Sequence, residues 1–242
     1  YSLVSEALYQ GPTQTAVKLK NPLSEDMLYM RNSLVPSLLQ VVQDNKSREL
    51  IKIFELSSTY HKKQNNLPEE KLILSGVLKK QNASFYEIKG LIEKLFEDLG
   101  INNYKFKQRK GEPGANITIG DKQVGYVEIL NNNTIDFELE FENILKHASL
   151  KKIYTPLAKF PPVFEDITFI LSEGTNTEDV IEEIKLQSFL IIDVSLKDQF
   201  ESSRTFHVIY QSADRNLTNK EVSEIREQII KGVVDKFKAS VK

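Results

Sequence analysis

Alternation of apolar and polar residues dominates the last third of the chain. It predicts strands at residues 166–171, 190–196, 204–211 and 239–242. Between them, apolar residues recur every three or four positions behind Thr175–Glu178 and Thr218–Glu221, two sequences with the spacing of a helix capping box. The predicted order is therefore strand, helix, strand, strand, helix, strand, which is typical of a ferredoxin-like domain.

The two parities of these strands predict different surroundings. The apolar set is expected to face the helices: Ile167, Phe169, Leu171, Ile192, Val194, Leu196, Phe206, Val208 and Tyr210. The other set is mostly polar and is expected on a face that no helix covers: Asp166, Thr168, Ile170, Asp193, Ser195, Lys197, Thr205, His207 and Ile209. RNA-recognition modules lay out unpaired bases on such a face. A solvated sheet face without a ligand is the equally weighted alternative.

The first half of the chain predicts an antiparallel sheet that carries helices, an α+β module. Pro36 suits the first turn of a short helix, and Ser84–Glu87 forms a capping box for a second helix that closes at Gly100. Strands are predicted at residues 49–56, 71–78, 104–108, 116–119, 123–129 and 135–141.

A proline-rich segment separates the two halves. Residues 153–162 contain three prolines, which cannot continue a helix and push their predecessors toward extended backbone. We therefore place a linker here and predict two domains, residues 1–152 and residues 153–242. The chain opens at Tyr1 without a Met or a signal-peptide pattern, so we interpret it as a fragment of a longer protein.

Composition narrows the classes of function. The 32 basic and 34 acidic residues give a formal charge of -2, which argues against a polyanion binder that works through net charge. The chain has no Cys, and its three histidines (His61, His147 and His207) lack metal-binding spacing, which argues against zinc and other histidine-built metal sites. The lack of Cys suits a reducing cytoplasm. No apolar run approaches the roughly 18 residues that a membrane crossing needs.

No catalytic constellation stands out. The glycine-rich phosphate loops and the nucleophile elbow are absent from the sequence, and Gly111–Gly114 is interpreted as a turn. Glu138, Glu140 and Glu142 alternate along a predicted strand, where paired acids bind Mg²⁺ or, as we favour, form a solvated strand face. His61 is expected in an exposed loop. The residues alone therefore indicate a non-catalytic, two-domain interaction protein.

Several collinear segments carry a family pattern. Asn21–Leu39 closely resembles the NPLSED…MR.SLLPGLL stretch of the bacterial phenylalanyl-tRNA synthetase beta subunit. Ile53–Leu56 is similar to that family's LFEIG strand, and Phe85–Gly90 to its DFYDLKG helix start. Lys159–Val163 and Arg215–Val222, the latter similar to RTLTDEEV, resemble its C-terminal anticodon-binding domain. The resemblance spans essentially the whole chain.

For the first half, the resemblance implies a class II synthetase-like antiparallel sheet that has lost its catalytic activity. In that family the active site sits on the alpha subunit, and no Arg occurs between Lys110 and Ser203 to bind ATP as a class II site requires. The implied parent is a cytoplasmic alpha–beta heterotetramer that uses ATP and magnesium to charge phenylalanine tRNA. This chain is expected to bind neither cofactor and to have no catalytic residue.

The segment that resembles a class II interface motif is expected to dock the alpha subunit or its own counterpart. The residues assigned to this interface are Pro22, Met30, Arg31, Leu34 and Pro36. Exposed Leu and Met side chains there would form an interface patch, and the alternative is that they belong to the core.

For the second half, the resemblance implies an anticodon reader. The family uses the end of the second strand and the start of the third, which correspond here to Asp198, Phe200 and Ser203. Asp198 would accept a hydrogen bond from a guanine edge, Phe200 would stack a base, and Ser203 would hold a base or phosphate. We add Arg204 and His207 as neighbours. The alternative for Phe200 is a residue that caps the core.

The chain departs from the family pattern near these residues. Glu165 replaces the usual Arg, the turn between Phe200 and Ser203 is shorter, and Ser202 replaces a Lys. Phe200 itself stands where the family has Tyr. A second hypothesis is therefore a subunit scaffold whose anticodon domain no longer contacts RNA. An independent small-molecule enzyme is a third and less favoured one.

Overall fold

The protein is described by a computed structural model, which defines residues 3–5, 8–9, 16–22, 24, 27–64, 66–109, 111–149, 151 and 158–242. The chain divides into two compact units, Tyr1–Ile153 and Tyr154–Lys242. The first half of the predicted linker, residues 153–157, lies outside the described residues, as do Leu23, Glu25 and Asp26 of the family-like segment.

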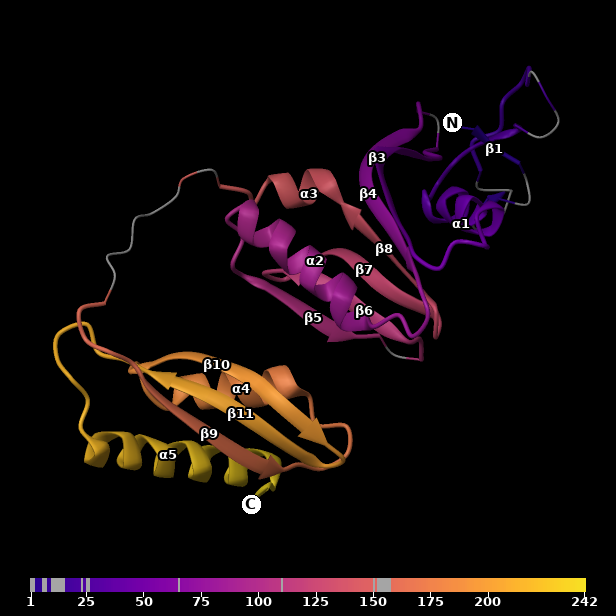
Figure 1. Ribbon diagram of the computed structural model, residues 1–242. Helices are drawn as coiled ribbons and strands as arrows, with labels where there is room; N and C mark the ends of the chain where they lie inside the picture. The colour runs from indigo at the N-terminus through magenta and orange to yellow at the C-terminus, as the bar shows by residue number, and fades with distance from the viewer. Residues whose placement is uncertain are drawn as a thin grey trace. The chain divides into compact units, whose positions relative to one another are not determined.

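The first unit is built on a six-stranded antiparallel sheet with the order β3-β4-β8-β7-β6-β5 (Figure 1). Its strands are β3 (Ile51–His61), β4 (Glu69–Lys79), β5 (Tyr104–Gln108), β6 (Gly114–Ile119), β7 (Lys122–Asn131) and β8 (Thr134–Glu140). Two short strands, β1 (Leu3–Val4) and β2 (Tyr29–Met30), pair separately. The helices are α1 (Val35–Asp44), α2 (Phe85–Asp98) and α3 (Phe141–Leu145).

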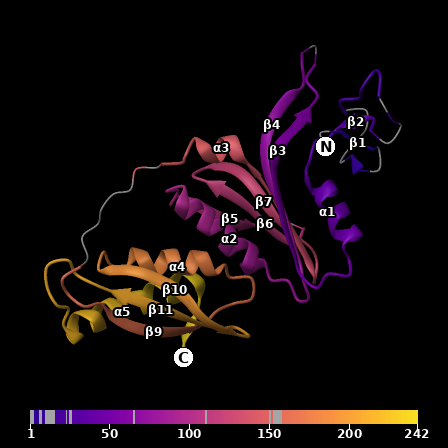
Figure 2. The same cartoon turned by 45° about the horizontal axis from the view of Figure 1, so that its top comes forward.

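Helices α1 and α2 lie on opposite faces of this sheet (Figure 2). The capping box of α2 is confirmed, because Ser84 Oγ accepts from the Tyr86 N–H and Glu87 accepts from the Ser84 N–H. The apolar stripe of α2 then buries Ile88, Ile92 and Phe96 against the sheet. The main core of the unit lies on this face.

Two predictions in the first unit are corrected by the sheet. The strand predicted at residues 135–141 stops at Glu140 and the chain turns into α3, so Glu142 does not share a strand face with Glu138. His61 is the last residue of β3 rather than part of an exposed loop, and its ring is half-buried. Long pairing between β3 and β4, which continues through the His61–Glu69 pair, extends the strand beyond its predicted end.

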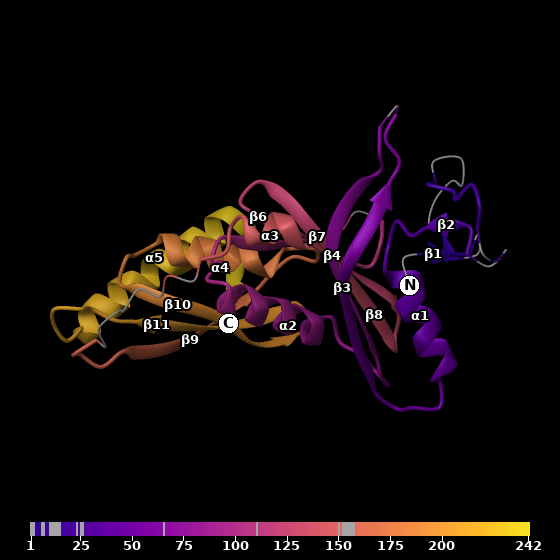
Figure 3. The same ribbon diagram turned by 90° about the horizontal axis from the view of Figure 1, so that it is seen from above.

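The second unit has the predicted ferredoxin-like order. Its elements are β9 (Val163–Ile170), α4 (Thr177–Leu186), β10 (Ile191–Phe200), β11 (Ser203–Tyr210), α5 (Asn219–Phe237) and β12 (Ser240–Val241). The four strands are ordered β10-β11-β9-β12. Both helices lie on the same side of this sheet (Figure 3), and their stripes bury Val180, Ile184, Ile229 and Val233.

The parity prediction holds for β9 and β11 and fails at the start of β10. Ile167, Phe169, Phe206 and Val208 are buried beneath the helices as expected. A β-bulge between Ile191 and Asp193 shifts the alternation by one residue, so Ile191 is buried and Ile192 is exposed.

The helix caps of the second unit are partly as predicted. Thr218 and Glu221 form the predicted capping box of α5, with Thr218 Oγ1 accepting from the Glu221 N–H. Helix α4 begins one residue later than its predicted capping box, because the Asn176 side chain, not Thr175, caps it and accepts from the Glu178 N–H.

Candidate nucleic-acid interface

The sheet of the second unit has one face without helices. Both of its helices pack on the other face, and no described element of the second unit itself covers this one (Figures 1 and 3). Cross-strand pairing brings its side chains into rows, with His207 between Asp166 and Ser195, and Thr205 beside Thr168. We call this surface, which includes residues of β9, β10 and β11, the open face.

Asp166 holds a charged cluster at the middle of the open face. Its Oδ2 pairs with Lys197 Nζ at 2.5 Å, and its Oδ1 lies 2.7 Å from His207 Nδ1. The hydrogen bond from Lys197, followed by that from His207, lowers the pKa of Asp166 below its ordinary value. Asp166 is therefore an ionised acceptor, and the His207 Nδ1–H must be the donor. This hydrogen bond fixes the orientation of the imidazole ring.

An exposed aromatic side chain lies against this cluster. The Phe164 ring stacks on the His207 ring with centroids 5.7 Å apart and an interplanar angle of 14°. Phe164 nevertheless keeps 56% of its surface exposed. The predicted strand began at Asp166 and so left Phe164 out; extending the alternation by one pair of residues would have placed it on the open face.

A tight hairpin between β10 and β11 forms one end of the open face. Phe200 pairs with Ser203, and Glu201 adopts a left-handed backbone conformation with φ of 52°. Phe200 is 71% exposed, so it does not cap the core. Asp198 is also exposed and pairs across the strands with Thr205. The structure therefore brings Asp198, Phe200 and Ser203 together, as the family resemblance implied.

Two residues from the sequence analysis lie on the helix-covered face instead. Arg204 donates from Nη1 to the Thr175 carbonyl at 2.6 Å and to Thr177 Oγ1 at 3.1 Å, so it fastens the start of α4. Glu165 accepts from the Tyr210 hydroxyl and pairs with Arg226 of α5. Glu165 thus adds no negative charge to the open face, and Arg204 is not grouped with the other predicted RNA-binding residues.

Two of the five residues predicted at the interface of the first unit are internal. Arg31 is 3% exposed, and its guanidinium donates to Glu55 Oε1 at 2.7 Å, to Ser57 Oγ at 2.5 Å and to the Ser58 carbonyl at 3.2 Å. Leu34 is fully buried. Of the remaining interface predictions, Pro22 is exposed, and Met30 and Pro36 are half-buried. For Arg31 and Leu34 the structure favours the core alternative.

Glu138 anchors the segment that precedes α1. Its Oε1 accepts from Ser33 Oγ at 2.8 Å and from the Leu34 N–H at 2.9 Å, and its Oε2 accepts from the Tyr126 hydroxyl at 3.1 Å. Burial, followed by the nearby charge of Glu138, raises the pKa of Tyr126, so its hydroxyl stays a donor. Glu138 is thus a structural acceptor rather than a solvated residue, a role that strand alternation alone did not reveal.

Asp136 lies on the same strand and lacks such partners. Its side chain is buried, and no described group hydrogen-bonds its Oδ1. Burial, and then the charges of Glu128 and Glu138, raise the pKa of Asp136 to about 7. Asp136 therefore takes up a proton near neutral pH instead of acting as a permanent anion.

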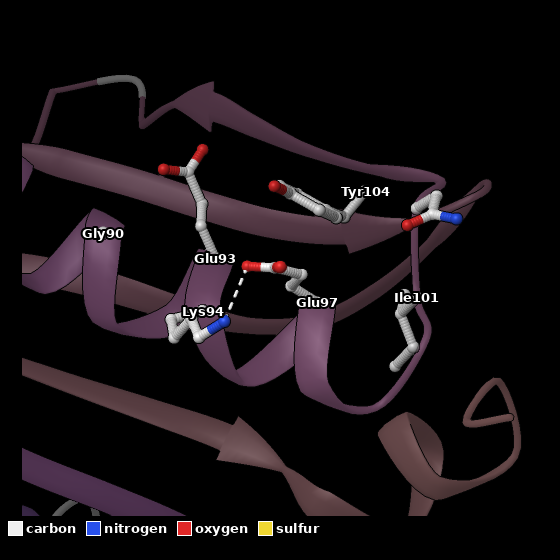
Figure 4. Close-up of a pocket in the computed structure, with 7 residues that line it drawn as sticks. Gly90, Glu93, Lys94, Glu97, Ile101 and Tyr104 are labelled. Atoms are coloured by element: carbon white, nitrogen blue, oxygen red, sulfur yellow. Dashed lines mark hydrogen bonds and ion pairs between the residues drawn. The ribbon is translucent and has the colours of Figure 1, made fainter. Parts of the chain in front are cut away.

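The cavities of the first unit hold internally paired charges. A cavity of about 430 Å³ beside α2 is lined by Glu93, Lys94, Glu97 and Tyr104, and Lys94 pairs with Glu97 there (Figure 4). The other lining residues are Gly90, Ile101 and Asn102.

A second cavity, of about 290 Å³, lies beside the ends of β3 and β8. It is lined in part by His61, Lys71 and Glu140. Lys71 pairs with Glu140 at 3.5 Å. Burial and the charge of Lys71 lower the pKa of His61. Within the described residues, no three Asp, Glu or His side chains are placed to hold a metal ion, and no helix has the length and hydropathy to span a membrane.

Fold and open face together define a class of protein: an antiparallel α+β module joined to a ferredoxin-like domain that has one sheet face free of its own helices. A family model described as "Phenylalanyl tRNA synthetase beta chain CLM domain" matches residues 1–141, and one described as "Ferredoxin-fold anticodon binding domain" matches residues 158–242. The chain belongs to the phenylalanyl-tRNA synthetase beta chain family.

Individual relatives agree with this assignment. The chain is 29% identical to the phenylalanine–tRNA ligase beta subunit of Halalkalibacterium halodurans over 96% of its own length and 34% of that protein. It is also 29% identical to that of Thermotoga maritima, over 91% and 32%. The chain therefore spans about a third of the length of these relatives.

Solved structures agree with the fold. The crystal structure of pyrrolysyl-tRNA synthetase from Desulfitobacterium hafniense matches with a TM-score of 0.50 and 11% identity, covering 60% of both chains. At this identity the likeness shows the fold alone, and it confirms the predicted synthetase-like α+β class.

Proposed function

We propose that this chain is a non-catalytic part of a phenylalanine–tRNA ligase beta subunit that binds the tRNA anticodon with its open face. The observation that carries this proposal is the exposure of Phe200 beside Asp198 and Ser203, on a helix-free sheet face of a domain that matches an anticodon-binding family. In this proposal Phe200 stacks one base, Asp198 accepts from a base edge, and Ser203 contacts the base or the phosphate.

Charge favours stacking over phosphate binding in this proposal. Lys197 is paired with Asp166, and Arg204 is held by α4 on the other face. Few cations therefore remain on the open face to release counterions from RNA. Base stacking contributes about 1–3 kcal/mol per base, so Phe200 supplies a large share of the affinity, and binding depends weakly on salt.

The proposed experiment is a titration of the chain with phenylalanine tRNA, beside the same tRNA with its anticodon replaced, at low and moderate salt. Weaker binding of the altered tRNA at both salt concentrations is the expected result. Equal binding of both tRNAs that vanishes as salt rises contradicts the proposal. The chain would then be a scaffold whose anticodon domain does not read bases.

A second part of the proposal concerns docking of the catalytic alpha subunit within a cytoplasmic heterotetramer. The edge strand β3 exposes Phe54 and Leu56 on one face, and Leu50 precedes them. An exposed apolar strip of this kind suits a protein partner. Arg31 and Leu34 are buried, and Arg31 hydrogen-bonds to Glu55 and Ser57 of β3, so these two residues stabilise the strand rather than contact a partner. Pro22, Met30 and Pro36 keep exposed area for contact.

Co-elution with the alpha subunit tests the docking surface. Phe54 is 76% exposed, so Phe54→Asp is expected to abolish co-elution without unfolding the chain. Tyr86 is similarly exposed on α2, and Tyr86→Asp is the matched control that should co-elute normally. Normal co-elution of the Phe54 variant would rule out this surface.

The described residues do not fit a magnesium–ATP site. No three acidic or His side chains in the described part of the chain come together, Glu138 already accepts three hydrogen bonds, and Glu140 pairs with Lys71. In this proposal ATP and magnesium belong to the whole enzyme, as the family resemblance implied, and no catalytic residue is assigned to this chain.

A further inference from the structure

The open face carries exposed aromatic rings at both of its ends. Phe200 pairs with Ser203, which pairs in turn with Ile170 at the end of β9. Phe164 lies six residues before Ile170 on the same strand. At about 3.3 Å per residue, the two ends are roughly 20 Å apart. One base therefore cannot contact both Phe164 and Phe200.

The end at Phe164 presents a flat, oriented surface. Its ring is stacked nearly parallel on that of His207, which supports it from one side. His207 cannot rotate freely, because its Nδ1–H donates to Asp166, and Lys197 holds the other oxygen of that carboxylate. An exposed ring beside an oriented imidazole is the arrangement in which a base stacks without a large loss of side-chain freedom.

The imidazole also offers a polar group for a base edge. In the neutral ring, donation from Nδ1 leaves Nε2 as an acceptor. No described residue forms a hydrogen bond with Nε2. Amino and imino N–H groups on the edges of bases are the complementary donors. The negative charge of Asp166 repels the RNA phosphates only weakly, because Asp166 forms an ion pair with Lys197.

We propose that Phe164 and His207, oriented by Asp166, form a second base-binding subsite on the open face, which takes another unpaired base of the same RNA strand that Phe200 binds. This subsite rests on the proposed function, since it requires RNA on the open face. Phe164 supplies the stacking surface and His207 Nε2 accepts from the base edge. Asp166 is a positioning residue that does not touch the RNA.

Anticodon stem-loop RNA with 2-aminopurine at one loop position at a time tests this subsite, because stacking quenches the fluorescence of that base. Binding to the unchanged chain should quench at least two loop positions. Phe164→Ala should restore fluorescence at one position, and Phe200→Ala at another. Each variant should weaken binding by about 5- to 150-fold, which corresponds to about 1–3 kcal/mol per stacked base.

Phe189 provides the control, since it is 92% exposed in the same unit and outside the open face. Phe189→Ala should bind RNA as the unchanged chain does. Phe164→Leu keeps an apolar residue at the site and should lose the quenching nonetheless, which separates stacking from burial.

The outcomes distinguish the two proposals. Normal binding and quenching in Phe164→Ala, with loss in Phe200→Ala, would refute the second subsite and leave the proposed function standing. Failure of the unchanged chain to bind the stem-loop would refute both. Loss of the same single position in both variants would also overturn the subsite, because it would mean that one base site is shared.

Discussion

Two polar clusters, one in each unit, use similar residues in opposite ways. Around Glu138, three donors from the α1 segment and the sheet converge on one carboxylate. Around Asp166, two donors hold a carboxylate on a face that the helices of its own unit leave uncovered, beside the exposed ring of Phe164. The first cluster joins parts of the chain, and the second leaves its neighbours available to a ligand. A hydrogen-bonded carboxylate therefore serves the fold where other parts of the chain cover it, as at Glu138, and can serve recognition where its neighbours stay exposed, as at Asp166.

The largest expected effect concerns Asp136, a buried residue on the same strand as Glu138. Its pKa of about 7 lies above the ordinary value of 3.8. Between these two pKa values, Asp136 keeps its proton in the folded state and loses it in the unfolded state. The contribution of protonated Asp136 to the free energy of unfolding is therefore complete below pH 4 and disappears as pH rises to 7. The loss is roughly 1.4 kcal/mol per pH unit, up to about 4 kcal/mol in total.

Asp136→Asn should remove this dependence. Denaturant unfolding from pH 4 to pH 8 should show the free energy of unfolding of the variant rising relative to that of the unchanged chain as pH increases. A constant difference across this range would mean that Asp136 does not titrate in the folded protein.

The next effect concerns the buried cation. Arg31→Ala leaves Glu55 and two β3 acceptors without their donor, and should lower the free energy of unfolding of the first unit by about 3 kcal/mol. Arg48 is exposed, and Arg48→Ala should have little effect. RNA affinity should be unchanged in both variants. A loss of RNA binding in Arg31→Ala with normal stability would contradict the structural role that we assign to Arg31.

A smaller effect is expected on the open face. Phe200→Ala should weaken RNA binding by about 2 kcal/mol while leaving thermal stability unchanged, because the ring is exposed in the free protein. Calorimetric titration and a melting curve on the same sample measure both quantities. A drop in melting temperature without a change in affinity would show that Phe200 serves the fold.

The smallest effect tests a family-like motif in the second unit. Arg215 and Glu221 pair through both oxygens, and Thr218 caps α5. Thr218→Ala should cost about 1 kcal/mol of stability without changing RNA affinity. Thr218→Ser should restore the stability. Arg215 and Thr218 lower the pKa of Glu221 to about 2. The stability that the ionised Glu221 contributes to the folded state is therefore lost as pH falls from 4.5 toward 2.

Local patterns predicted much of the fold because they depend on neighbouring residues. The capping boxes at Ser84 and Thr218 and the alternation in β11 were read directly. The bulge at Ile192 was not, since it arises from pairing with β11 rather than from the β10 sequence. For the same reason, alternation alone showed neither that Glu138 meets Ser33 nor that Arg31 meets Glu55.

For the candidate site too, the sequence could place the residues that lie close together in the chain but not the contacts between strands. The β10–β11 hairpin places Asp198, Phe200 and Ser203 near one another, and the resemblance that named them lies within the same short segment. Their role in RNA binding stays a prediction. Arg204 follows Ser203 directly, yet lies on the other face, because successive residues of a strand alternate. Phe164 has the parity of Asp166, so a longer predicted strand would have placed it on the open face. Its stacking on His207 depends on the register of β9 against β11, which the sequence does not state.

The most direct test of where recognition occurs is photo-crosslinking of the full chain to phenylalanine tRNA with 4-thiouridine at the first anticodon position, followed by mass spectrometry of the crosslinked peptides. The account predicts crosslinks in the segment from Asp198 to His207, and their loss in Phe200→Ala. Crosslinks confined to the first unit, Tyr1–Ile153, would contradict it.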